Sequence, residues 1–100
     1  MSSQIQISTP FLRKFIHADF TVGVTPTNII AAVAPGEKRI STIIQNKHAT
    51  NTLTVILNDA GTTGFIIQPA TFFSIDNYQG TIRVFGSGAN TTVHVAYCIV

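Results

Sequence analysis

Apolar and polar residues alternate along most of the chain after residue 20, with the period of two that half-buried β-strands have. The stretch 52–58 shows this well, because Leu53, Val55 and Leu57 fall on one face of an extended chain. Clusters of Gly, Pro, Asn and Asp, which favour turns, separate the apolar stretches. The stretches expected to form strands are 20–24, 29–33, 39–46, 52–58, 65–67, 71–75, 81–85 and 92–100.

Short strands with turn signals at intervals of about 8–12 residues favour an all-β fold. We predict a single antiparallel β-sandwich over residues 20–100, with an eight-stranded jelly roll as its topology. In the third strand, the alternation places Ile40 on the same face as Thr42 and Ile44.

Residues 1–19 differ from the rest and are predicted to form an N-terminal arm. The apolar residues after Pro10 are spaced as one face of a short helical turn, although an extended arm fits equally well. Such residues need a partner surface, on this domain or on a neighbouring subunit. The candidate interface residues are Phe11, Leu12, Phe15 and Ile16.

Charged residues make up only 10% of the chain, against a usual value near 25%. Because exposed domains stay soluble through charge, this deficit indicates a surface that other subunits cover. The six basic residues form no run of the length that nucleic-acid or membrane patches have, so a nucleic-acid partner is not expected. The adjacent pairs, such as Lys38 and Arg39, are expected on solvated faces or beside carboxylates.

Cys98 is the only cysteine, which excludes a disulfide within the chain and a thiolate metal cluster. Its place in a strand pattern predicts a buried, inert thiol. The first residues lack the pattern of a signal peptide. No apolar run approaches the ~18 residues of a membrane span. We therefore expect synthesis in a cytoplasm.

The residue types of common active sites are present but lack the required spacing. The four acids lie apart at turns or strand edges, which argues against a carboxylate pair. His17, His48 and His94 form no metal-binding motif; only a site with one histidine from each subunit of an oligomer is left open. No activated nucleophile is recognisable. The sequence therefore predicts a protein that is not an enzyme and has no cofactor.

The strand phrases "RISTIIQN", "TLTVILND", "GFIIQPATFFSID", "GTIRVFG" and "TTVHVAYC" carry a resemblance. In style and order they resemble small β-sandwich structural proteins of bacteriophage virions, over roughly residues 38–98. The chain departs from that style at Pro69-Ala70, where glycine commonly follows the proline.

The resemblance implies a non-enzymatic viral structural protein, associated with the capsid as a decoration, vertex (penton) or fibre-base subunit. It implies a symmetric homo-oligomer, a trimer or a pentamer, that contacts other virion proteins such as the major capsid protein. The expected location is the virion, after synthesis in the host cytoplasm.

A second hypothesis from another class is a carbohydrate- or receptor-binding β-sandwich module that uses three loops. A small hydrolase is a third and weaker alternative. The candidate ligand residues of the binding module are His48, Asn51, Asp59, Asp76 and Tyr78.

Overall fold

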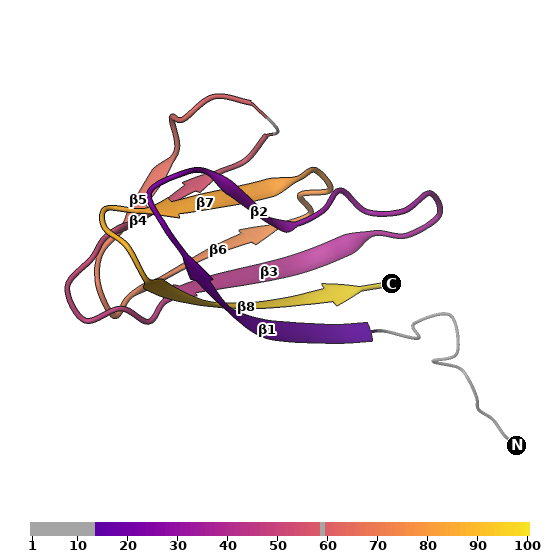
Figure 1. The fold of residues 1–100 in the computed structure, drawn as a ribbon. Helices are drawn as coiled ribbons and strands as arrows, with labels where there is room; N and C mark the ends of the chain where they lie inside the picture. Colours follow the sequence, from indigo (N-terminus) through magenta and orange to yellow (C-terminus); the bar gives the residue numbers. More distant parts are fainter. Residues whose placement is uncertain (1–13, 59) are drawn as a thin grey trace, which may run out of the picture.

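The computed structural model describes residues 14–58 and 60–100, and the described chain folds into eight strands (Figure 1). The strands are β1 (Lys14–Val22), β2 (Thr27–Ile30), β3 (Arg39–Asn46), β4 (Leu53–Ile56), β5 (Phe65–Ile67), β6 (Phe72–Asp76), β7 (Ile82–Gly86) and β8 (Thr91–Ile99).

The strands form two four-stranded sheets, with the orders β1-β8-β3-β6 and β2-β7-β4-β5. Every pairing is antiparallel. The first strand pairs with the last, the second with the seventh, the third with the sixth and the fourth with the fifth. The predicted all-β antiparallel sandwich is confirmed, and the jelly-roll topology stays a prediction.

The core lies between the two sheets and follows from the alternation. On β8, Val93 and Val95 are buried between the sheets, while His94 and Ala96 lie on the opposite, outer face. Leu53 and Val55 of β4 supply the facing layer and are fully buried, as their spacing predicts. Burial of each such side chain contributes about 1.5–3 kcal/mol to folding.

Strand β1 differs from the prediction for this part of the chain. Residues 14–19, predicted to lie in the arm, pair with β8 from the register Lys14↔Ile99 onward. Phe15 and Ile16 are therefore extended and point to opposite faces of the sheet, instead of sharing one face of a helical turn. The sandwich includes the chain from Lys14, and Phe11 and Leu12 lie outside the described residues.

The start of β3 also departs from simple alternation. A register shift between Arg39 and Ser41 interrupts the pairing with β8. Such a bulge inserts one extra residue into the strand, so the side chains before it point to the opposite face from the one that alternation predicts. As a result Arg39 points inward and is buried, while Ile40 lines a pocket that also contains the outward-facing Ile43. The prediction that Ile40 shares the face of Thr42 and Ile44 is wrong for this reason.

Candidate functional site

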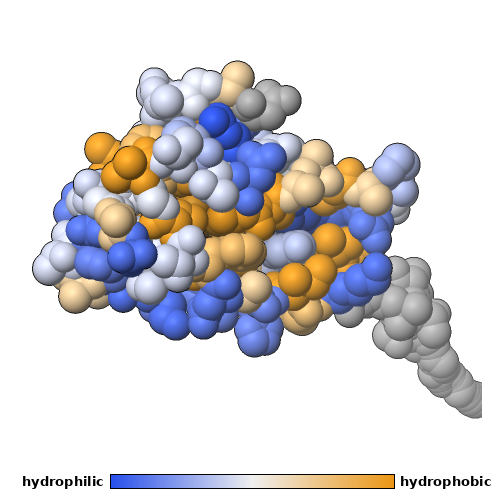
Figure 2. All heavy atoms as spheres, in the orientation of Figure 1, coloured by the Kyte–Doolittle hydropathy of each residue, from blue (hydrophilic) through white to orange (hydrophobic). Residues whose placement is uncertain are grey.

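The outer face of the β1-β8-β3-β6 sheet carries an apolar patch, which we call the outer patch: Phe15, Ile43, Phe72 and Ala96. The strand registers bring it together, because Ile43 pairs with Ala96 and Gln45 with Phe72. Phe15 is 77% exposed, Phe72 65% and Ile43 44%. Apolar side chains reach the molecular surface between polar ones in Figure 2.

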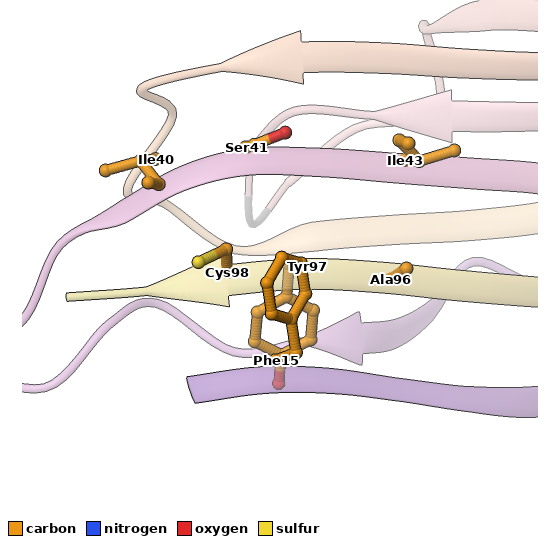
Figure 3. Close-up of a pocket in the computed structure, with 7 residues that line it drawn as sticks. All are labelled: Phe15, Ile40, Ser41, Ile43, Ala96, Tyr97 and Cys98. Carbon is orange, nitrogen blue, oxygen red and sulfur yellow. The ribbon is translucent and has the colours of Figure 1, made fainter. Parts of the chain in front are cut away.

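A pocket of about 140 Å³ opens on this face beside Phe15 (Figure 3). Phe15 of β1 and Tyr97 of β8 lie on one side of it, and Ile40 and Ile43 of β3 lie on the other. Cys98 also lines the pocket and is itself buried, which confirms the predicted buried thiol. The lining is mostly apolar, so the pocket suits an apolar side chain of a partner better than a polar ligand.

Arg39 closes the end of the sandwich at which β2 leads into β3. Its side chain is 1% exposed and donates hydrogen bonds to the carbonyl oxygens of Ala31 (3.0 Å), Tyr78 (3.0 Å) and Gly80. Its Cζ lies 5.8 Å from the ring centroids of both Tyr78 and Tyr97, which suits cation–π attraction. The expected solvated face or carboxylate contact is therefore wrong for Arg39.

The electrostatics of Arg39 follow from this enclosure. Burial lowers the pKa of the Arg39 guanidinium, and the neighbouring Tyr97 and Tyr78 act in the opposite direction. The group remains cationic at neutral pH, because arginine starts from a very high pKa. Because its guanidinium donates to carbonyl groups of both the β2–β3 and the β6–β7 loop, Arg39 holds these two loops together.

The candidate ligand residues do not form one site. His48 and Asn51 lie in the β3–β4 loop, whereas Asp76 pairs with Ser41 near the opposite end of β3. Tyr78 lies at that opposite end too, where its hydroxyl donates to the carbonyl oxygen of Thr81 at 3.0 Å. Asp59 lies outside the described residues.

Both candidate residues of the β3–β4 loop hold the loop itself. His48 Nδ1 accepts hydrogen bonds from the backbone N–H groups of Thr50 (3.1 Å) and Asn51 (2.9 Å). Asn51 Nδ2 donates to Thr91 Oγ1 at 3.0 Å. These bonds give His48 and Asn51 structural roles within the chain.

Asn46 is a buried polar residue that the sequence reading did not single out. Its Nδ2 donates to the carbonyl oxygens of Asn51 (2.8 Å) and Ile67 (3.1 Å), and its Oδ1 accepts from the His48 N–H (3.0 Å). Asn46 points inward because it lies two and four residues after Ile44 and Thr42 on β3, and alternate residues of a strand share a face. A polar side chain on the apolar face of a strand, directly before a loop, was the available signal.

Charged groups gather on the outer face where β1 meets β8. Asp19 Oδ1 lies 2.6 Å from His94 Nδ1 and 3.4 Å from Lys47 Nζ. The hydrogen bond from His94, followed by that from Lys47, lowers the pKa of the Asp19 carboxyl. The ring centroid of His17 lies 5.5 Å from that of His94.

Comparison with known proteins adds a structural relative. No protein-family model and no curated protein matches the chain. Among solved structures, a protein of Bacillus endospore appendages, described as a novel family of disulfide-linked pili, superposes with a TM-score of 0.67 at 18% identity. The match covers 88% of this chain and 84% of that chain. It establishes a shared small β-sandwich fold.

This comparison corrects the expectations that came from the virion resemblance. The matched structure belongs to a spore appendage pilus and not to a bacteriophage capsid. The predictions of a capsid decoration, penton or fibre-base subunit, of a major capsid protein as partner and of a virion location are therefore wrong.

The described residues contain no helix that could cross a membrane.

Proposed function

We propose that this chain is a non-enzymatic structural subunit that assembles with copies of itself into a polymeric surface appendage. The outer patch is the observation that carries the proposal, because it offers an exposed apolar surface, with a pocket, to another subunit. The fold shared with an appendage pilus protein supports the choice of an open polymer. A closed trimer or pentamer stays a prediction that mass measurement can test.

The outer patch suits a protein surface better than water. Phe15 and Phe72 are mostly exposed and Ile43 is nearly half exposed. Phe15 and Ile43 line the mostly apolar pocket, and Phe72 extends the apolar surface onto β6. Large contiguous apolar patches are uncommon on monomers and commonly mark interaction sites. Removing water from charged groups is costly. Because this chain has few charged residues, another copy can cover the patch with little of that cost.

The rim of this sheet carries charges that are already paired. On the outer face, Lys47 Nζ lies 3.4 Å from Asp19 Oδ1. At the end of β1, Lys14 alternates with Phe15 and points to the other face, where its Nζ lies 3.2 Å from Glu37 Oε2. Paired charges around an apolar centre are the usual anatomy of a protein interface. The occupant we propose is therefore a second copy, with Phe15 and Phe72 as the anchors.

A pair of charge substitutions tests the proposal. Phe15→Asp combined with Phe72→Asp places two carboxylates in the outer patch, and we expect polymers seen by negative-stain electron microscopy to disappear. The control is Val24→Asp, because Val24 is an apolar residue of similar exposure (62%) in the β1–β2 loop, away from the patch.

Sedimentation velocity gives the quantitative readout, with circular dichroism as the check on folding. The proposal requires that the Val24→Asp variant polymerises like the unchanged chain and that the folded double variant sediments as small species. The proposal is ruled out if the unchanged chain stays a 10.8 kDa monomer at all concentrations. Polymers of normal length from the double variant would also rule out the outer patch.

A further inference from the structure

Two histidines and an aspartate lie together on the outer face of β1 and β8. His17 and Asp19 share this face because they are two residues apart on one strand. Asp19 pairs directly with His94 across the strands, and His17 pairs with Ala96, which makes His94 its diagonal neighbour. The rings of His17 and His94 are 5.5 Å apart between centroids.

Asp19 fixes the proton on His94. An ionised carboxylate only accepts hydrogen bonds, so the 2.6 Å contact places the proton on His94 Nδ1. In the neutral ring, Nε2 then keeps its lone pair free for a ligand. Metal-binding histidines almost always donate their other N–H in this way, to a carboxylate or a carbonyl group.

We infer that His17 and His94 form a two-histidine binding site for a divalent transition metal such as Zn²⁺, with Asp19 as the residue that orients His94. Zn–N bonds of about 2.0–2.1 Å in tetrahedral geometry place two imidazole centroids about 5 Å apart, close to the spacing seen here. Imidazole suits Zn²⁺, Cu²⁺ and Ni²⁺ and not the hard ion Mg²⁺.

The number of protein ligands sets the character of the site. Within residues 14–58 and 60–100, no group of three metal-ligating side chains converges. Water molecules complete the coordination, so the site binds metal reversibly. The sequence predicts no metal site and leaves open only one with a histidine from each subunit. The site inferred here differs, because pairing of β1 with β8 brings two histidines of one chain together.

The neighbouring charges act in opposite directions on a bound cation. The Asp19 carboxylate lies 2.6 Å from His94 Nδ1, and its negative charge favours a bound cation. Lys47 lies 3.4 Å from the same carboxylate oxygen and opposes the metal. Removing the Lys47 charge is therefore expected to tighten binding, while removing the Asp19 charge weakens it by about tenfold.

Isothermal titration of the untagged full chain with ZnCl₂ tests the inference, with MgCl₂ as the blank. His17→Asn and His94→Asn are each expected to weaken Zn²⁺ binding by at least tenfold. The matched control is His48→Asn, because an asparagine oxygen can replace the His48 Nδ1 that accepts the loop N–H groups. This control is expected to bind Zn²⁺ like the unchanged chain.

Further measurements separate a metal site from a purely structural role. Lys47→Gln should bind Zn²⁺ more tightly, and Cu²⁺ should broaden the ring proton signals of His17 and His94 at lower concentrations than those of His48. The inference is overturned if Zn²⁺ binds no better than Mg²⁺, or if His48→Asn weakens binding as much as His17→Asn. It does not rest on the proposed function, because the titration requires no polymer.

Discussion

Arg39 shows how a local irregularity can overturn a prediction from alternation that is correct for the rest of the strand, from Ser41 onward. Strict alternation groups Arg39 with Ser41 and Ile43, which face outward, and predicts a solvated cation. The bulge at Ile40 reverses this parity and buries the guanidinium against three carbonyl oxygens. A bulge leaves no mark in the hydrophobic pattern, so the buried cation could not be found from the pattern alone.

Replacing Arg39 should cost far more stability than replacing an exposed arginine. Arg39→Met keeps much of the volume but removes the guanidinium that donates to the carbonyl groups of Ala31, Tyr78 and Gly80. We expect a loss of about 2–4 kcal/mol in the free energy of unfolding, because unsatisfied buried polar groups cost about 1–3 kcal/mol each and loop carbonyls partly rehydrate. Urea unfolding measures the change.

Arg83→Met is the matched control for this experiment. Among residues 14–58 and 60–100, the side chain of Arg83 donates one exposed hydrogen bond, from Nη1 to the carbonyl oxygen of Gly61 at 2.9 Å. Its removal should change the unfolding free energy by no more than about 0.5 kcal/mol. Equal urea midpoints of unfolding for Arg39→Met and Arg83→Met would show that the hydrogen bonds of Arg39 do not stabilise the two loops.

Ala70 occupies a backbone conformation that favours glycine. Its φ is +62°, in the left-handed region, where a Cβ atom is disfavoured. Ala70→Gly relieves this strain but adds freedom to the unfolded chain, and we expect a net gain of about 0.5 kcal/mol. Thermal or urea unfolding measures it.

Ala89→Gly, in the β7–β8 turn, has the opposite expected sign. Residues with positive φ among the described non-glycines are Ala70, Asn77 and Asn90, so Ala89 gains nothing from glycine. The added freedom of the unfolded chain should therefore destabilise this variant by up to about 1 kcal/mol. A loss of stability in Ala70→Gly as well would contradict the assignment of strain.

At the scale of elements, the strands after β1 lie close to where the apolar pattern placed them, except β2, which spans Thr27–Ile30 instead of the predicted 29–33. β1 was harder to predict from sequence, because apolar residues at 11, 12, 15 and 16 fit a helical turn as well as an extended strand. What makes residues 14–19 a strand is pairing with β8 at the other end of the chain; the contacting side chains of Asp19 and His94 are 75 residues apart in sequence. Periodicity within a segment carries no information about such a distant partner.

Two truncations test where the folded sandwich begins. Deleting residues 1–12 leaves all eight strands in place, and we expect an unchanged free energy of unfolding. Deleting residues 1–18 removes the half of β1 that pairs from Lys14↔Ile99 to Ala18↔Val95. The lost ladder hydrogen bonds, each worth about 0.5–1.5 kcal/mol, should lower the free energy of unfolding by about 2–4 kcal/mol.

The same variants test the role predicted for the arm. If Phe11 and Leu12 contact a neighbouring copy, deletion of residues 1–12 should shorten or abolish the polymers while stability stays unchanged. Polymers of normal length after this deletion would remove the arm from the proposed assembly. A loss of stability in the shorter truncation would instead show that the arm belongs to the fold.

At the scale of the whole molecule, the nested pairing of strands decides which predicted residues can act together. It separates the candidate ligand residues, because His48 follows the end of β3 whereas Asp76, the last residue of the antiparallel strand β6, lies beside the start of β3. It also brings Phe15 and Phe72 onto one sheet face, although they are far apart in sequence. Sequence patterning found the layers and much of the core, but only the strand order shows that the plausible surface for a partner is a sheet face.

The single cysteine of the chain, Cys98, limits how disulfide bonds could link the subunits. The matched pili are described as disulfide-linked, but one cysteine can form only one disulfide and so can join these chains only in pairs. Cys98 is buried as well. We therefore expect polymers that persist in a strong reducing agent and that form equally well from Cys98→Ala, as judged by electron microscopy and non-reducing gels. Polymers that dissolve on reduction, or a folded Cys98→Ala variant that stays monomeric, would contradict a non-covalent assembly through the outer patch.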